Sequence, residues 1–373
     1  MPDPGRPHPA EPAVAAPAGG PADGPAYETP PRQPVAVRVT PELELSAAAR
    51  LVSDGVGPRA NAAKRMLTAA AIHGIDLSLM WATVDAGARQ PRVRQVCLAV
   101  PGAGRTVMLI LSGPEGGEPI AGGEGPTAER VACIRAACDH LEGGREGEGG
   151  RSGRDIRIAQ ALPEPHEPWA VRALVTAGFL KVGDLAYLRR PLARTAPIPE
   201  PRWPQGVSVR TIGGAAPGHQ DRAALLEALD RSYEETLDCP ELCGLRETAD
   251  ILESHRATGQ FNPGLWWLVF LDGAAHGCML LSHCPDHHSV ELVYLGLSKE
   301  LRGRRIGSRL LEMGLGRLAQ VPADHMTCAV DLRNAPAMRL YERMGFREFG
   351  RRVALVRPVS GRSPGPREEI HNP

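Results

Sequence analysis

The sequence lacks an excess of charge of one sign, a long apolar run and a dense set of paired cysteines. Lys plus Arg and Asp plus Glu both number 43, so the net charge indicates neither nucleic acid nor an anionic membrane as the main partner. No window supplies the roughly 18 uncharged apolar residues of a membrane span, and the start MPDPGRPHPA has no signal-peptide pattern. We therefore expect a soluble cytoplasmic protein without a nucleic-acid or membrane partner.

The eight cysteines are scattered and include no C-x-x-C pair, which predicts reduced thiols rather than a disulfide framework. One cluster contains enough soft ligands for zinc: Cys239, Cys243, His283, Cys284, His287 and His288. Its C-x3-C spacing is unusual, and the histidines resemble a hairpin turn. We expect no metal, and a zinc-binding interaction module stays an alternative.

Stretches rich in proline divide the chain. Residues 1–34 and 359–373 read as disordered tails, and residues 193–206 as a linker. The two remaining bodies, residues 35–192 and 207–358, are each long enough to bury a core. We therefore predict two domains.

The two bodies resemble each other. They begin with the similar segments VAVR at residue 35 and VSVR at residue 207. An offset of 167 superposes Gly178-Phe179 on Gly345-Phe346 and Arg190-Pro191 on Arg357-Pro358 without a gap. This self-similarity predicts a tandem duplication.

The hydrophobic pattern of the second body predicts the element order β-α-α-β-β-β-α-β-α-β. Asp272-Gly273 indicates a tight hairpin, and Gly345 stands where a helix C-cap is expected. The predicted class is α/β, with a mixed sheet and helices on both faces.

A short glycine- and arginine-containing stretch, RGRRIGSR at residues 302–309, lies between a predicted strand, Glu291–Leu297, and a predicted helix, Leu310–Ala319. Small residues let the backbone approach an anion, and the free N–H groups and dipole of a helix start attract it. The stretch therefore predicts a cradle for a phosphate-containing ligand.

With Asn334 and Tyr341 seven residues apart before Gly345-Phe346, this pattern resembles the GNAT superfamily of acyl-CoA N-acyltransferases over residues 207–358. The resemblance implies two tandem GNAT-like domains, acetyl-CoA as co-substrate and a primary amine as acceptor. The family loop, [Q/R]-x-x-G-x-[G/A], falls on Arg302, Arg305 and Gly307. Arg305 replaces the usual middle glycine, and at positive φ its side chain would cost on the order of 1 kcal/mol.

The resemblance also assigns site residues. The CoA pyrophosphate would rest on the loop backbone, and the pantetheine arm would bind the strand before it. The cofactor-binding residues implied are Leu295, Gly296, Leu297, Arg302, Gly303, Arg304, Arg305, Ile306, Gly307, Ser308 and Asn334. Glu291 resembles the family's general base, with His283, His287 and His288 as rivals, and Tyr341 the acid that protonates the leaving thiolate.

A glycine inside a strand, Gly296, indicates a bulge or a close backbone approach. The acceptor pocket of such folds is lined by the first two helices and the following hairpin. Here that means Tyr233, Glu234, Asp238, Cys239, Glu241, Arg246, His255, Trp266 and Trp267. No local pattern among them names the amine.

The first body lacks this machinery. At the offset of 167, Leu174 replaces Tyr341 and Glu167 replaces Asn334. We expect a degenerate copy that packs against the active one or shapes its acceptor cleft. The degenerate copy and Arg305 leave a non-catalytic acyl-CoA-binding sensor as the alternative function. The sequence does not indicate the oligomeric state.

Overall fold

The computed structural model describes residues 33–52, 59–85, 91–116, 118, 123–143, 155–192, 201–213 and 218–359. The predicted tails and linker lie outside these residues, except for residues 33–34, 201–206 and Val359. Val359 is fully buried in the core and donates its N–H to Arg157 O at 2.9 Å, so it belongs to the folded body rather than to a tail. No described helix is long and apolar enough to span a membrane.

The two halves of the chain contain the same elements in the same order, apart from short 3-10 turns. The first half has β1 (Ala36–Arg38), α1 (Pro41–Leu51), α2 (Arg59–His73), β2 (Met80–Asp85), β3 (Arg92–Gly102), β4 (Thr106–Leu111), α3 (Glu124–Gly143), β5 (Ile158–Ala161), α4 (Pro168–Thr176) and β6 (Leu180–Pro191). The second has β7 (Val207–Thr211), α5 (His219–Tyr233), α6 (Thr248–Arg256), β8 (Trp266–Leu271), β9 (Ala274–Cys284), β10 (Ser289–Leu297), α7 (Ile306–Arg317), β11 (His325–Asp331), α8 (Ala335–Arg343) and β12 (Arg347–Pro358). The predicted element order is confirmed for the second half and extends to the first.

The offset of the sequence repeat holds in the structure. Helix α4 and strand β6 begin and end 167 residues before α8 and β12. Gly178 and Gly345 follow the two helices at φ +94° and +84°. Phe179 and Phe346 then donate their N–H groups to Leu174 O and Tyr341 O, both at 3.0 Å. Both helices therefore end in the same glycine C-cap.

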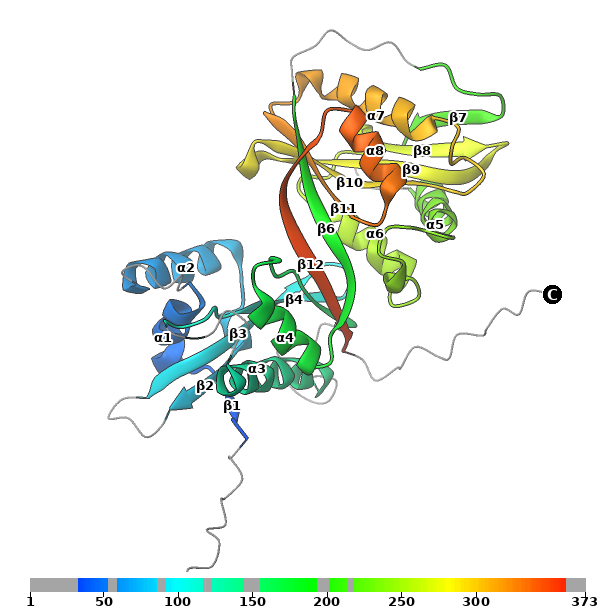
Figure 1. Ribbon diagram of the computed structural model, residues 1–373. Helices are drawn as coiled ribbons and strands as arrows, with labels where there is room; N and C mark the ends of the chain where they lie inside the picture. Colours follow the sequence, from blue (N-terminus) through cyan, green and yellow to red (C-terminus); the bar gives the residue numbers. More distant parts are fainter. Residues whose placement is uncertain are drawn as a thin grey trace, which may run out of the picture. The chain divides into compact units, whose positions relative to one another are not determined.

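One mixed sheet runs through both halves, in the order β1-β2-β3-β4-β5-β12-β6-β11-β10-β9-β8-β7. The last strand of each half pairs with the other half: β12 pairs with β5, and β6 pairs with β11. In Figure 1 these two long strands, β6 in green and β12 in red, run side by side, and they also pair with each other. The terminal strands are thus exchanged, and the division into domains 35–192 and 207–358 stays a prediction.

Helices cover both faces of the sheet in each half. In the second half, α5 and α6 bury one apolar cluster that includes Leu225, Leu252 and Trp266. Helices α7 and α8 bury a second cluster on the opposite face, which includes Leu310, Tyr341 and Phe346. These helix layers cover β10 on both faces of the sheet. A ligand can therefore reach the backbone of β10 only where this strand parts from β11.

Candidate active site

The parallel strands β10 and β11 pair only at one end. Ser289 to Glu291 lie opposite His325 to Thr327, and no further pairs follow. Beyond this point β10 also shifts its register against β9 between Leu292 and Tyr294. Backbone N–H and C=O groups of β10 thereby lose a strand partner on the β11 side, which leaves room for an extended ligand between the two strands.

The structure distinguishes the two predicted roles of Gly296, a bulge and a close approach. The irregularity lies between Leu292 and Tyr294 rather than at the glycine. Gly296 is instead a site of close approach, because a Cβ atom there would collide with the ring of Tyr294. The ring is held in place by a hydrogen bond of 2.7 Å between its hydroxyl and Ser232 Oγ.

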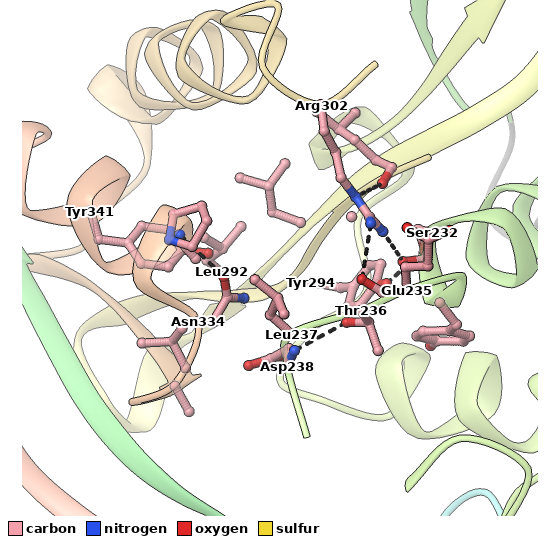
Figure 2. Close-up of a pocket in the computed structure, with 18 of the residues that line it drawn as sticks. Ser232, Glu235, Thr236, Leu237, Asp238, Leu292, Tyr294, Arg302, Asn334 and Tyr341 are labelled. Atoms are coloured by element: carbon pink, nitrogen blue, oxygen red, sulfur yellow. Dashed lines mark hydrogen bonds between the residues drawn. The ribbon is translucent and has the colours of Figure 1, made fainter. Parts of the chain in front are cut away.

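A cavity of about 300 Å³ occupies the gap between β10 and β11 (Figure 2). Its lining contains the predicted residues Leu295, Gly296, Leu297, Arg302, Asn334 and Tyr341, and, from the predicted acceptor pocket, Tyr233 and Asp238. The sequence interpretation missed four lining residues from the last turn of α5 and the segment after it, Ser232, Glu235, Thr236 and Leu237. No periodic pattern or motif marks that segment, so only its proximity to the predicted helix end could have indicated it.

The predicted phosphate cradle begins beside the cavity and leads into α7. Arg305 is the N-cap residue at φ +59°, and Gly303 also has positive φ, at +76°. In the described structure, the backbone N–H groups of residues 303–308 have no backbone acceptor. A row of free donors at a helix start is the arrangement that binds phosphate groups, so this loop fits the pyrophosphate of an acyl-CoA.

Gly307 supports the same interpretation. A Cβ atom at this position would meet Leu340 at 3.5 Å and Leu297 at 3.8 Å, which are ordinary contacts. Protein packing therefore does not require glycine here, although glycine inside a helix costs about 1 kcal/mol relative to alanine. The close approach of a ligand to the backbone would explain the residue.

The guanidinium of Arg302 is bound by backbone carbonyls of the protein. It donates to Leu297 O at 3.0 Å and to three carbonyls at the end of α5 and just beyond it, Ser232 O, Glu234 O and Glu235 O, at 2.9 to 3.1 Å. These carbonyls carry the negative end of the helix dipole, which favours a cation. Arg302 therefore ties the α5 end to the end of β10 at the mouth of the cavity (Figure 2).

Tyr341 and Asn334 form the opposite wall of the cavity (Figure 2). Burial raises the pKa of Tyr341, with smaller contributions from Cys328 and Asp238, so its phenol stays protonated at neutral pH. Asn334 caps α8 by accepting from Ala337 N–H at 3.3 Å. This bond uses its oxygen, and in Figure 2 its amide nitrogen faces the cavity, so capping and ligand binding are compatible.

Glu291 lies at the closed end of the gap, where β10 still pairs with β11, and does not line the cavity. Burial raises the pKa of its carboxyl, and His287 lowers it to a smaller extent. The rival bases His287 and His288 lie at a 3-10 turn between β9 and β10, as expected for a hairpin connection. His283 also lies outside the cavity lining and contacts Pro322 O at 3.3 Å.

Several residues of the predicted acceptor pocket have other roles. Trp266 and Trp267 are buried in apolar clusters on opposite faces of the sheet. His255 is stacked on Tyr294 with ring centroids 5.2 Å apart. Arg246 donates to Gly104 O at 3.1 Å. None of these four side chains lines the cavity between β10 and β11, because helix and strand membership alone does not give the direction of a side chain.

The zinc cluster considered from the sequence does not assemble. Within the described ranges, no three His, Cys, Asp or Glu side chains are grouped in a way that could hold a metal ion. Cys239 is buried, and its N–H donates to Asp331 Oδ2 at 3.1 Å.

The first half has a charged side chain near its equivalent gap. Strands β4 and β5 pair in parallel only from Thr106 to Met108. Arg130 of α3 is fully buried. It donates to the two carbonyls just after β4, Ser112 O and Gly113 O, at 3.2 and 3.1 Å, and forms an ion pair with Glu118. Its guanidinium also lies 4.6 Å from the ring centre of Trp169, which corresponds by the offset to the cavity residue Pro336. This packing supports the prediction of a degenerate copy.

The comparisons with known proteins agree with this geometry. The model of the Acetyltransferase (GNAT) family matches residues 226–346. The chain is 30% identical over 286 residues to a mycothiol acetyltransferase of Tsukamurella paurometabola, covering 71% of this chain and 89% of that relative. This chain belongs to the GNAT acetyltransferase family. As a GNAT protein it is an acyltransferase, and the predicted fold class is confirmed.

Further relatives and one solved structure extend the comparison. A mycothiol acetyltransferase of Thermomonospora curvata is 31% identical over 219 residues, covering 56% of this chain and 70% of that relative. Alignments with five other mycothiol acetyltransferases cover 50% to 64% of their lengths. The crystal structure of a GCN5-related N-acetyltransferase from Sphaerobacter thermophilus has a TM-score of 0.51 at 21% identity, covering 89% of this chain and 98% of that one. This last similarity concerns the fold alone.

Proposed function

We propose that this acetyltransferase transfers the acetyl group of acetyl-CoA to a primary amine by direct attack. The observation that carries the proposal is the cavity between the parting strands β10 and β11, with Tyr341 on its wall and the free N–H groups of residues 303–308 beside it. Acetyl-CoA supplies a thioester, whose carbonyl carbon accepts the amine. The residues that would hold it are the loop at 303–308, the β10 backbone from Leu295 to Leu297, and Asn334.

Two side chains have proposed roles in proton transfer. An ammonium must lose a proton before it can attack, and Glu291 is the proposed base, because its raised pKa makes it a better proton acceptor than an ordinary carboxylate. Tyr341 is the proposed acid, which gives its phenolic proton to the thiolate that leaves. Holding the amine and the thioester next to each other would supply a large part of the rate.

Glu291 lies outside the cavity lining, so it would act through water. Ser282 lies opposite Glu291 in the β9–β10 register. Its buried hydroxyl has no hydrogen-bond partner within the described part of the chain. A buried hydroxyl without a partner beside a carboxylate is a suitable place for an ordered water molecule.

A thiol-release assay with acetyl-CoA tests this function. The first acceptor to use is the unacetylated form of mycothiol, because the relatives are named mycothiol acetyltransferases. Amino acids, polyamines, aminoglycosides and small peptides complete the panel. We expect release with at least one amine, and no release with any of them would contradict the proposal.

Tyr341→Phe and Glu291→Gln test the two roles. Each substitution should lower kcat by about 10². The wild-type rate should fall with decreasing pH as Glu291 becomes protonated, which gives the pH–rate profile a low-pH limb. This limb should disappear in Glu291→Gln, and the rate of that variant should follow the fraction of the amine that is unprotonated. Equilibrium binding of acetyl-CoA should be unchanged in both variants. Unchanged turnover in both would remove Glu291 and Tyr341 from the mechanism.

A further inference from the structure

Asp238 is a carboxylate in the cavity whose role in the reaction is unassigned. It follows α5 and lines the same cavity as Tyr341 and Asn334. In the view of Figure 2, Asp238 and Leu237 lie between the wall formed by Asn334 and Tyr341 and the wall formed by Ser232 to Thr236. Its side chain stays accessible to solvent although many protein atoms surround it, so a ligand in the cavity can reach it.

Two hydrogen bonds fix the position of Asp238. Its N–H donates to Thr236 Oγ1 at 3.1 Å, and its Oδ1 accepts the N–H of Asp331 at 2.8 Å. Asp331 is the last residue of β11, the strand that parts from β10. The carboxylate is therefore held at the edge of the cavity by one oxygen, and the fixed geometry favours binding of a small ligand group.

The neighbouring acids already have cationic partners. Arg333 forms ion pairs with Asp331 at 2.7 Å and with Glu241 at 2.6 Å. Asp238 has no ion pair among the described residues. A negative charge that faces a cavity without a counter-ion attracts a cation, and the acceptor enters the reaction as one.

The surroundings of Asp238 also favour a cation. Burial and the Asp331 carboxylate raise its pKa, and the N–H of Asp331 lowers it. Asp238 raises the pKa values of Tyr294, Tyr341, Cys239 and Cys328, and none of these four groups carries a positive charge. An ammonium in the cavity would stabilise the ionised carboxylate and gain an ion pair in a partly desolvated place.

We propose that Asp238 is the binding site for the ammonium group of the acceptor. It holds the ammonium in the cavity that contains Tyr341, and the proton then leaves to Glu291 through water. The inference rests on the proposed function and deepens it, because it selects cationic amines over neutral acceptors of the same shape. Asp238 binds and positions the amine but does not change the reaction. The bond formed joins the amine nitrogen to the acetyl carbon, and the bond broken is the thioester bond of acetyl-CoA.

Asp238→Asn is the decisive variant. Its amide oxygen can still accept the N–H of Asp331, but the negative charge is lost. We expect the KM for the amine to rise about tenfold or more, while the KM for acetyl-CoA stays within about twofold. The low-pH limb assigned to Glu291 should remain. Asp238→Ala, which also loses the hydrogen bond to Asp331, should show the same rise together with a lower melting temperature.

Glu227→Gln is the matched control, because Glu227 is paired with Arg231 on the surface of α5 and lies outside the cavity lining. It should leave both KM values unchanged. An amine KM in Asp238→Asn within about twofold of wild type would overturn the inference, as would an equal rise in Glu227→Gln. If the wild-type protein releases no thiol with any amine, the proposed function fails first, and the two failures are thus distinguishable.

Discussion

Arg305 has a backbone conformation that glycine normally adopts. Its φ of +59° and ψ of +16° lie in the left-handed region, where a side chain costs about 1 kcal/mol. The sequence raised this possibility because the family loop has glycine at this position. The chain thus accepts strain in order to place a guanidinium beside the predicted phosphate cradle.

Replacing Arg305 by glycine and by alanine separates strain from charge. Both variants remove the guanidinium, but only glycine relieves the backbone, so Arg305→Gly should be more stable than Arg305→Ala by about 1 kcal/mol. Both should weaken acetyl-CoA binding to a similar extent. Urea unfolding and equilibrium titration with acetyl-CoA measure the two effects. Equal stabilities of the two variants would show that residue 305 is not strained. An affinity for acetyl-CoA equal to that of wild type would show that the charge of Arg305 does not reach the ligand.

His255 should make the stability of the protein depend on pH. Burial, and to a smaller extent Arg246, lower its pKa to about 4, so the folded state keeps it neutral while the unfolded state binds a proton below about pH 6.5. Stability is therefore lost as the pH falls from about 6.5 towards 4. His255→Phe, which can still stack on Tyr294, should lose about 1 to 2 kcal/mol less than wild type between pH 7 and pH 5. Parallel pH profiles of urea unfolding would contradict this explanation.

At the scale of elements, the sequence predicted the order of the helices and strands of the second half. The reason is local: Asp272-Gly273 adopts the predicted hairpin turn with both residues at positive φ, and Gly345 ends α8. The cavity was less predictable. Asp238 lies in a segment without periodicity, and its direction depends on Asp331, a residue 93 positions further along the chain.

Arg302 connects two elements, and its geometry gives a prediction at this scale. Lysine at this position would keep the charge but could not reach the same set of carbonyls, because only the guanidinium has several donors in a fixed plane. Arg302→Lys should lower the free energy of unfolding by about 1 kcal/mol, since the site is exposed. It should also raise the KM for acetyl-CoA, because the end of α5 forms the mouth of the cavity.

Arg317→Lys, an exposed change in the last turn of α7, is the control for Arg302→Lys. It should change neither stability nor KM. If the two variants behave alike, a single positive charge near residue 302 is sufficient, and the network of carbonyl contacts has no separate role.

At the scale of the whole molecule, the pairing of the strands could not be predicted from the sequence. Alternation of apolar residues shows which face of a strand is buried, but it does not name the neighbouring strand. Nothing in β6 or β12 indicates that each pairs with the other half. The duplication itself was predictable, because both copies keep Gly-Phe after the last helix and Arg-Pro at the end of the last strand.

The strand exchange predicts how fragments behave. A fragment of residues 1–196 would lack β12, the antiparallel partner of β5, and one of residues 197–373 would lack β6, the antiparallel partner of β11. Open strand edges favour aggregation, so each fragment expressed alone should be insoluble or self-associated. Expressed together, the two should form a soluble 1:1 complex, as size-exclusion chromatography with light scattering can show. A monomeric, stable fragment 197–373 would contradict this expectation.

The exchanged strands give the first half, which we predict to be a degenerate copy, a reason to persist. Gene duplication ordinarily leaves one copy free to decay once its chemistry is lost. Here the surviving site is built against a strand that the other copy encodes, so selection on acetyl transfer also preserves the first copy's fold. Substitutions that destabilise the first half should therefore lower enzyme activity, although they lie outside the residues proposed for the reaction.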